Sequence, residues 1–387
     1  MLLASLLTTA AAGALAASHA PADAASRWLV YFGTYTSNSK SRGIYVASFD
    51  SATGRLGPPR LAAETENPSF LALHPTRPLL YAVNEVNSFE GQRAGSVTAF
   101  AIDPATGDLR ALGRVSSKGA DPCHLAVDRS GRHLLVANYS GGSVASLSLR
   151  PDGGLEPAAG FVQHSGASID PKRQTAPHAH MVETDPQNRF ALVADLGLDQ
   201  VLVYRFDAGT GHLEPSAPPH VSVDPGSGPR HFAFSPDGRD LYVLNEMRLT
   251  ITAFRYQAGR LSEFQSVSAL PASMKPGPAD SGAEIAVHPN RRFVYASLRG
   301  HDLLAVFARD AGTGRLGLVE HVPSGGRTPR SFVIDPTGRY LLAANQQSDQ
   351  VVVLRINPET GRLSPTGATI AVSAPVSMAF FRGSVPR

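Results

Sequence analysis

A few histidine, arginine and glutamate residues lie beside short apolar runs, where a side chain held in one position can do chemistry. Arg230 and His231 directly precede the run Phe232-Ala-Phe, and Glu246 follows the next apolar run, sixteen residues after Arg230. A positioned glutamate or histidine can transfer a proton, which typically accelerates a reaction about 10² to 10⁴-fold. An arginine can stabilise a developing negative charge or bind a carboxylate or phosphate. These residue types therefore predict acid–base chemistry on a small molecule that is, or becomes, anionic.

The elements that must position these residues form a repeat. A turn of the form x-Gly-x-Leu recurs at leucine intervals of 53, 46, 58, 48, 55 and 47 residues, with its glycine at Gly54, Gly107, Gly153, Gly211, Gly259, Gly314 and Gly361. A tight hairpin needs a positive φ at such a position, which favours glycine. An alternating apolar run of the kind typical of a β-strand precedes each turn. Two further sets of short apolar runs recur in the same phase, so each unit contains four strands.

Seven units of four strands describe an all-β fold, a single seven-bladed β-propeller around a central channel. The C-terminal run Met378-Ala-Phe-Phe has no partner strands of its own, and the segment Leu29–Glu64 lacks an innermost strand. We therefore expect the two ends of the chain to share a composite closing blade, which removes an open sheet edge.

Composition and charge exclude several classes of protein. The chain has 387 residues, with 42% hydrophobic and 17% charged residues, which is sufficient for a large core. Its net charge is 35 − 32 = +3 without a basic run, so no nucleic-acid partner is expected. The single cysteine, Cys123, excludes an intrachain disulfide and a multi-cysteine metal site. Beyond the N-terminus there is no uninterrupted apolar run of about 18 residues, so no membrane span is predicted.

The first 24 residues differ from the rest of the chain. Leu2–Ala17 is an uncharged run of apolar and small residues, and Ala22-Asp-Ala follows as a cleavage pattern. These features are typical of a secretory signal peptide. We expect residues 1–24 to be removed and residues 25–387 to form the propeller domain, in the periplasm or outside the cell.

Aligning the repeats exposes positions that differ in chemistry from one unit to the next. In each blade, the start of the innermost strand should lie beside the end of the second strand, at one mouth of the channel. The position directly before each innermost strand is occupied, in blade order, by Phe70, His124, His180, His231, Glu284, Ser331 and Ser377. The position one residue earlier is occupied by Ser69, Cys123, Ala179, Arg230, Ala283, Arg330 and Val376. The ends of the second strands are aligned as Glu85, Tyr139, Leu196, Glu246, Arg299, Gln346 and Thr34. Packing alone would make such positions similar, so their diversity predicts a functional site at this mouth.

The motifs at these positions resemble the seven-bladed β-propeller lactonase family, which includes propeller-type 6-phosphogluconolactonases and a carboxymuconate cycloisomerase. The resemblance covers roughly Leu29 to Phe381 and rests on Tyr31-FGTYT, Asn67-PSFLALHP, Tyr81-AVNE, Pro122-CHLAVD, Pro177-HAH, Gly228-PRHFAFSP, Leu244-NE, Ser297-LRG, Pro329-RSFVIDP and Asn345-Q. It implies a lactone hydrolase with a small-molecule lactone or carboxylate substrate and no cofactor or metal. The alternatives are a lactone-forming cycloisomerase and a propeller that binds a ligand without catalysis.

The resemblance also implies the site residues. Catalytic roles fall to His180, Arg230, Glu246 and Arg299, with His180 or Glu246 as the base. Substrate-binding roles fall to His124, His178, Arg330, Gln346 and Glu85.

One neighbouring set of polar residues has two interpretations. Asn84, Asn138, Asp195, Asn245 and Asn345 precede the second-strand ends and should point the other way, since side chains alternate along a strand. We expect them to cap turns. A rival hypothesis makes them a Ca²⁺ site together with Glu85 or Glu246.

Overall fold

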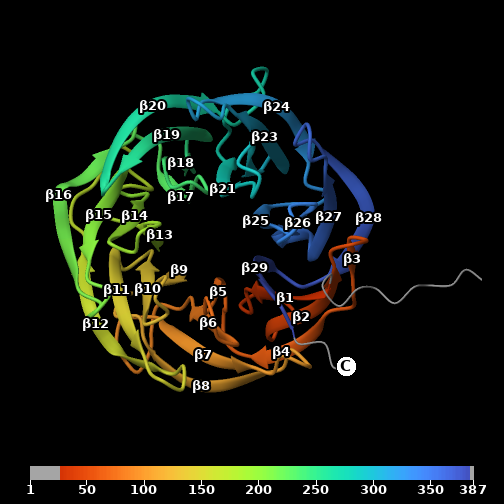
Figure 1. Ribbon diagram of the computed structural model, residues 1–387. Coiled ribbons are helices and arrows are strands. Elements are labelled where there is room, and N and C mark those ends of the chain that lie inside the picture. Colours follow the sequence, from red (N-terminus) through yellow and green to blue (C-terminus); the bar gives the residue numbers. More distant parts are fainter. Residues whose placement is uncertain (1–26, 384–387) are drawn as a thin grey trace, which may run out of the picture.

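The computed structural model describes residues 27–383, and these form a ring of seven antiparallel sheets around a channel (Figure 1). The seven-bladed propeller is therefore confirmed. Within the described residues the only helical element is the 3₁₀ turn η2 (Gln346–Ser348). None of the described residues belongs to a helix long and apolar enough to cross a membrane. The predicted signal segment, residues 1–24, lies outside the described residues.

We number the blades from the closing one and give their strands from the channel outward. Blade 1 contains β29 (Pro375–Phe381), β1 (Arg27–Thr34), β2 (Gly43–Asp50), β3 (Arg55–Leu56) and β4 (Arg60–Glu64). Blade 2 contains β5 (Leu71–Leu73), β6 (Leu79–Asn84), β7 (Ser96–Ile102) and β8 (Leu109–Ser116). Blade 3 contains β9 (Pro122–Val127), β10 (His133–Asn138), β11 (Ser143–Leu149) and β12 (Leu155–Gln163). Blade 4 contains β13 (Ala179–Thr184), β14 (Phe190–Asp195), β15 (Gln200–Phe206) and β16 (Leu213–Ser222).

The remaining three blades follow the same order. Blade 5 contains β17 (Pro229–Phe234), β18 (Asp240–Asn245), β19 (Thr250–Gln257) and β20 (Arg260–Ser268). Blade 6 contains β21 (Ser281–Val287), β22 (Phe293–Arg299), β23 (Leu303–Arg309) and β24 (Leu316–Pro323). Blade 7 contains β25 (Pro329–Ile334), β26 (Tyr340–Asn345), β27 (Gln350–Ile356) and β28 (Leu363–Ala371).

The ring closes as predicted from the two ends of the chain. The last strand, β29, pairs antiparallel with the first, β1, with Met378 opposite Phe32. The C-terminal strand therefore supplies the innermost position of blade 1 (Figure 1). This pairing hydrogen-bonds both terminal strands, so neither is left as an open edge.

The core lies between neighbouring blades. Each second strand packs apolar side chains against the next sheet, as Phe32 and Phe49 of blade 1 do against Tyr340 of blade 7. The repeated turn glycines adopt the positive φ that the hairpin requires, for example 79° at Gly107. The carbonyl of that glycine accepts a hydrogen bond of 2.9 Å from the buried hydroxyl of Tyr31 in the preceding blade. The turn motif thus closes a hairpin and also joins two blades.

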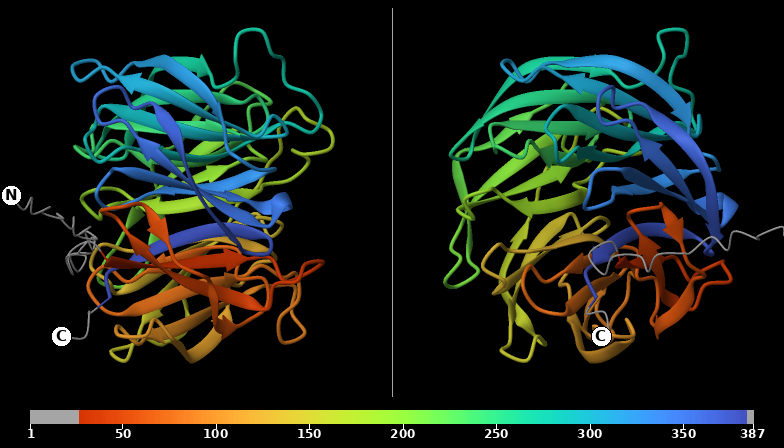
Figure 2. Two further views of the ribbon diagram at one scale, coloured as in Figure 1. Left: turned by 90° about the vertical axis from the view of Figure 1, so that its right-hand side faces the viewer. Right: turned by 45° about the vertical axis from the view of Figure 1, so that its right-hand side comes forward.

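The innermost strands carry the structural feature that positions the site. In β9, β13, β17, β25 and β29 the register with the second strand shifts by one residue near the start of the innermost strand. Such a β-bulge re-aims a side chain. The two long loops 164–178 and 269–280 project from the face where these strands begin, whereas both ends of the described chain leave on the opposite face (Figure 2).

Candidate active site

A pocket of about 430 Å³ lies at the mouth where the innermost strands begin and the second strands end, which we call the near mouth. Every blade contributes to it, because the ends of the inner strands converge on the channel axis. Its lining comprises Tyr35, Glu85, Cys123, Tyr139, Arg173, His180, Glu246, Pro278, Ala279, Asp280, Ser281, Arg299 and Arg330. Of the nine predicted site residues, the structure brings together His180, Glu246, Arg299, Arg330 and Glu85 along the wall, with Arg230 directly behind it.

Glu246 lies at the centre of a cluster of arginines. Its carboxylate is 2.7 Å from Arg173 Nη2, 2.9 Å from Arg299 Nη2 and 3.0 Å from Arg230 Nε. The Arg230 contact is an ion pair without hydrogen-bond geometry, since that Nε makes no hydrogen bond among the described residues. Arg230 is only 2% exposed, and its Nη1 donates to the carbonyl of Ala283. The cluster joins blades 5 and 6 through Arg230, Glu246 and Arg299, and loop 164–178 adds Arg173.

The arginines determine the charge state of Glu246. Burial alone would raise the pKa of Glu246, but the guanidinium groups of Arg299, Arg230 and Arg173 outweigh it and lower the pKa to about 2. For Arg299, burial disfavours the charged guanidinium and lowers its pKa to about 10, although the attraction of Glu246 opposes this shift. Glu246 is therefore ionised throughout the physiological range and is a weak base. Its chemistry is to hold three cations in place.

The second carboxylate of the pocket, Glu85, has a different environment. The hydroxyl of Tyr35 donates to it, 2.8 Å from Oε1 and 2.9 Å from Oε2, and the Ser69 hydroxyl donates to Oε2. Arg330 reaches it only through Tyr35, whose hydroxyl is 2.8 Å from Arg330 Nη2. Burial raises the pKa of Glu85, and Arg330 and the two hydroxyls oppose that rise only in part. Glu85 is thus a carboxyl group of the pocket that can exchange a proton, whereas the third one in the lining, Asp280, lies 2.9 Å from His301 Nε2.

His180 lines the pocket beside these groups. Burial, reinforced by the positive charge of Arg230, holds the pKa of His180 well below its usual value, so the imidazole is neutral. Its Nδ1 is buried without a hydrogen-bond partner among the described residues, which leaves Nε2 as the nitrogen that the pocket can reach. A neutral imidazole with an available nitrogen can accept a proton from water.

The structure shifts the alignment of blade 4 by one residue at His180. Met181, and not His180, pairs with Ala194 in the way that His124 pairs with Ala137 and His231 pairs with Leu244. His180 is the bulged residue of its strand and is equivalent to Arg230. The corrected set of bulged residues is Ser69, Cys123, His180, Arg230, Ala283, Arg330 and Val376.

His124 was predicted to bind substrate, and the corrected alignment explains why the structure places it elsewhere. The residue after each bulge faces along the channel away from the near mouth, because side chains alternate along a strand. His124 packs on Phe70 with ring centroids 4.1 Å apart and on His231 at 5.4 Å. These rings form a plug that closes the channel below the pocket. The expected convergence of three histidines on one mouth is therefore wrong, and His180 alone lines the near-mouth pocket.

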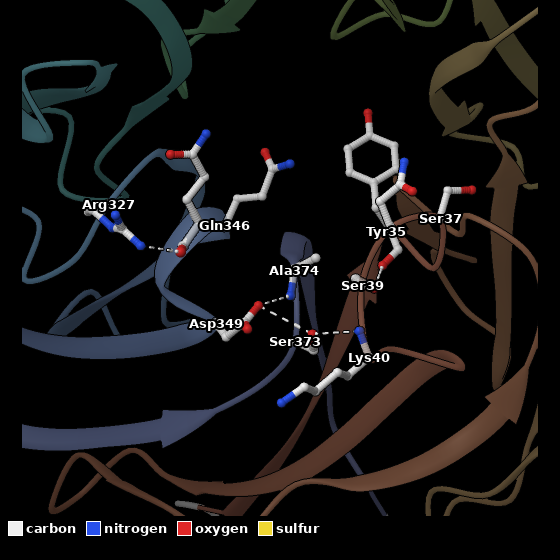
Figure 3. A pocket seen from close by; sticks show the side chains of 11 residues that line it. Tyr35, Ser37, Ser39, Lys40, Arg327, Gln346, Asp349, Ser373 and Ala374 are labelled. Carbon is white, nitrogen blue, oxygen red and sulfur yellow. Dashed lines mark hydrogen bonds between the residues drawn. The ribbon is translucent and has the colours of Figure 1, made fainter.

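Two further predicted binding residues also lie outside the pocket. His178 stacks on Tyr139 with ring centroids 4.5 Å apart, and its Nδ1 is 3.1 Å from the Tyr139 carbonyl, so it supports a pocket residue from behind. Gln346 lines an adjoining pocket of about 700 Å³, which meets the first at Tyr35 (Figure 3). That pocket also contains Lys40 and Arg327, and Arg327 donates to the Gln347 carbonyl (Figure 3).

The sequence missed two residues that complete the site. Tyr35 takes the second-strand position in blade 1 that the alignment assigned to Thr34, whose buried hydroxyl instead bonds the Gly43 carbonyl. The bulge of this blade is Val376 on β29, so β1 itself is regular, and aligning Tyr31 with Tyr81 places Tyr35 opposite Glu85 in the repeat. Arg173 comes from loop 164–178, which has no counterpart in the other repeats, so repeat alignment could not find it.

The neighbouring amide residues cap loops, as expected. Asn84 Nδ2 donates to Thr65 Oγ1 at 2.8 Å, and its Oδ1 accepts from Thr98 at 2.7 Å. Asp195 Oδ1 accepts from the backbone of His178 at 2.7 Å and Gly197 at 3.0 Å. In the part of the chain that the structure describes, no group of three or more His, Cys, Asp or Glu residues is arranged to hold a metal ion.

Comparison with known proteins adds to this geometry. Residues 29–380 match the family described as "Lactonase, 7-bladed beta-propeller". The chain is 35% identical over 357 residues to a 6-phosphogluconolactonase of Bacillus subtilis, covering 92% of this chain and 99% of that protein. It resembles the structure of a Pseudomonas aeruginosa periplasmic gluconolactonase with a TM-score of 0.87 and 34% identity, covering 93% of this chain and 100% of the other. A putative 6-phosphogluconolactonase from Bacteroides fragilis matches with a TM-score of 0.86 and 35% identity, covering 93% and 99%.

Proposed function

Since the chain belongs to the seven-bladed β-propeller lactonase family and is a lactone-hydrolysing enzyme, we propose that the near-mouth pocket opens an aldonolactone, with His180 as the base. One observation carries this proposal. A neutral histidine lies in the same pocket as Glu246, an ionised carboxylate that holds two arginines of the pocket wall, Arg173 and Arg299, and Arg230 behind the wall. Ester hydrolysis needs both a base for water and fixed positive charge for the oxyanion.

The reaction begins with water. His180 Nε2 accepts a proton from a water molecule as the water oxygen bonds to the lactone carbonyl carbon. The carbonyl oxygen becomes an oxyanion in a tetrahedral intermediate. A low pKa makes the imidazole a modest base, and fixed cations next to the reacting carbonyl compensate by stabilising the charge that forms.

Arg299 is the residue that we assign to the oxyanion. It lines the pocket, unlike Arg230, and one of its Nη2 contacts is the Glu246 carboxylate at 2.9 Å. Glu246 and Arg230 hold this guanidinium group in a fixed orientation, so little reorganisation is needed when the oxyanion forms. Arg330, which is stacked on the Tyr35 ring at 5.2 Å, is placed to bind the carboxylate of the product.

Collapse of the intermediate breaks the bond between the carbonyl carbon and the ring oxygen. The departing oxygen needs a proton, and Glu85 is the pocket carboxyl whose pKa is raised toward neutrality by burial. We assign Glu85 as this proton donor, with Tyr35 and Ser69 fixing its orientation. The new carboxylic acid then loses its proton, which restores the proton of Glu85, and the proton held by His180 goes to solvent, so that the product is the hydroxy acid in its carboxylate form.

The substrate class follows from the polar lining and from the relatives. The pocket contains hydroxyl, carboxylate and guanidinium groups and few apolar ones, which suits a polyhydroxylated lactone. The relatives that carry an activity in their names are a 6-phosphogluconolactonase and a periplasmic gluconolactonase. We propose a gluconolactone-type substrate on these grounds.

We also propose that the protein acts outside the cytoplasm, as a propeller domain of residues 25–387. The support is the uncharged run Leu2–Ala17 followed by Ala22-Asp-Ala. N-terminal sequencing of protein from its native cell should begin near Ala25. An intact Met1 in a cytosolic fraction would contradict this location.

A panel of lactones tests the activity. Purified protein is assayed by pH-stat with glucono-δ-lactone, 6-phosphogluconolactone and an aromatic-pathway muconolactone, with spontaneous hydrolysis subtracted, before and after treatment with EDTA. We expect turnover of at least one aldonolactone, unchanged by the chelator. Turnover of carboxymuconate alone, followed by ultraviolet absorbance, would instead support a cycloisomerase. Loss of activity with EDTA, restored by Ca²⁺, would overturn the metal-independent mechanism.

A further inference from the structure

The opposite end of the channel, which we call the far mouth, holds a second pocket of about 670 Å³. It is lined by the later residues of the inner strands β13, β17 and β21 and by the turns that follow β13 and β17. The plug of Phe70, His124 and His231 lies between this pocket and the near mouth. The two pockets share no lining residue, and they adjoin where the ring centroids of His180 and His231 lie 5.1 Å apart.

One position in the far mouth breaks the repeat. Each inner strand carries a channel-facing residue two places after the plug position, paired with Tyr31, Tyr81, Leu135, Leu192, Tyr242, Tyr295 or Leu342 of the second strand. In six blades it is small and apolar, namely Ala72, Ala126, Ala233, Ala286, Val333 and Ala379. In blade 4 it is Glu183. Six blades thus show that the fold needs no carboxylate here.

A neighbouring position departs from the repeat as well. Five of the turns that follow the inner strands contain a proline, Pro75, Pro186, Pro236, Pro289 and Pro336, where blade 3 has Arg129. Arg129 lines the same pocket as Glu183. Its Nε donates to the Asp185 carbonyl at 3.1 Å, which fixes the side chain against blade 4.

Glu183 has no protein partner, although Arg129 lies in the same pocket. Within residues 27–383 its carboxylate makes no hydrogen bond and no ion pair within 4.0 Å. Burial raises the pKa of Glu183 to about 7, and the attraction of Arg129 opposes this rise only in part. Glu183 is half-buried, so its unpaired carboxylate has lost part of its hydration, which costs free energy unless something compensates the charge.

The other polar groups of the pocket do not offer that compensation. Glu284 is a second carboxylate, already bonded to His231 Nδ1 at 2.8 Å. Because that nitrogen carries the hydrogen, His231 Nε2 is an acceptor, and it has no partner among the described residues. Apolar side chains also line the pocket, among them Met181, Phe234 and Ile285. The pocket thus combines unsatisfied acceptors, an excess of negative charge and several apolar side chains.

We propose that the far mouth is a second ligand site, which binds a small molecule with an ammonium group and an apolar body. The ammonium group donates to Glu183, and the apolar body packs against Met181 and Phe234. This site takes no part in lactone hydrolysis, so a test of ligand binding at the far mouth does not depend on the proposed function.

The repeat supplies a matched variant for the test. Glu183→Ala installs the residue that five other blades carry at this position, so the variant should fold and should hydrolyse lactone at the wild-type rate. Isothermal titration calorimetry is run with phenethylamine and with 2-phenylethanol, which has the same apolar body without the charge. Glu246→Gln serves as the control for binding at the near mouth.

We expect saturable binding of phenethylamine to the wild type and to Glu246→Gln, and none of 2-phenylethanol. Glu183→Ala should weaken binding of the amine at least about tenfold, the loss of one charge-assisted contact. Three results would each overturn the proposal: no binding of the amine to the wild type, equal binding to Glu183→Ala, or loss of binding in Glu246→Gln. In the first case Glu183 is a solvated carboxylate only.

Discussion

The two mouths of the channel show what a departure from a repeat means. Both are built from the same seven inner strands, and both contain a carboxylate where most blades have none, buried at Glu246 and half-buried at Glu183. At the near mouth three arginines surround Glu246, and the pKa of its carboxyl falls to about 2. At the far mouth Glu183 has no contact partner, and its pKa rises to about 7. The charge of Glu246 is compensated by the protein and is part of a preorganised site. The charge of Glu183 is not compensated by the protein, and on this ground we propose that a ligand binds there.

The largest effect is expected at the compensated carboxylate. Glu246→Gln removes the charge that holds Arg173, Arg230 and Arg299, so the oxyanion-binding guanidinium loses its fixed orientation. We expect kcat to fall at least about 10²-fold. Breaking a buried ion pair on one side costs about 3–5 kcal/mol, so the thermal midpoint should fall as well. Steady-state kinetics and thermal unfolding of the same preparation measure both.

Acid titration checks the sign of that stability effect. Because the folded pKa of Glu246, about 2, lies below the ordinary glutamate value of 4.5, its contribution to stability is present above pH 4.5 and is lost as the pH falls toward 2. The stability gap between wild type and Glu246→Gln should therefore close below about pH 4.5. A variant with normal kcat and normal stability would show that the cluster has no role in the site.

A smaller effect is expected at the other near-mouth carboxylate. Glu85→Gln keeps the hydrogen bonds from Tyr35 and Ser69 but cannot give a proton to the ring oxygen. We expect kcat to fall about tenfold. This is less than the usual effect of removing a general acid, since solvent water can also protonate the departing oxygen. The wild-type kcat should decline at high pH as Glu85 loses its proton, and the variant should lack that decline. An unchanged alkaline limb in Glu85→Gln would remove Glu85 as the proton donor.

The smallest effect on activity is expected at the far mouth. Glu183→Ala should leave kcat unchanged and alter only the pH dependence of stability. A carboxyl whose folded pKa is raised stabilises fully below its unfolded pKa and loses that contribution as the pH rises through the folded value. The wild type should therefore lose a few degrees of thermal midpoint relative to Glu183→Ala between about pH 4.5 and 7. Parallel curves for the two proteins would mean that solvent reaches Glu183 freely.

The sequence predicts the fold far better than the side-chain directions at the channel. The Gly-x-Leu turns recur because every hairpin needs the same positive φ, so strand number and ring closure follow from spacing alone. At the position of His124 and His231 blade 4 has the apolar Met181, so its apolar run begins one residue earlier, and an alignment on the start of that run sets His180 beside His124. Arg173 lies in a loop that is not repeated, and its contact with Glu246 spans 73 residues of sequence. Such a contact becomes visible only when the ring is closed.

The most direct test of the account is the kcat of His180→Asn with glucono-δ-lactone, measured beside the wild type and corrected for spontaneous hydrolysis. Asparagine keeps a polar side chain at the bulge but cannot accept a proton from water. With the arginine cluster intact, we expect an unchanged thermal midpoint, a KM close to that of the wild type and a kcat lower by about 10² to 10⁴-fold. A folded variant with near-normal kcat would contradict the assignment of His180 as the base and, with it, the central claim about the near mouth.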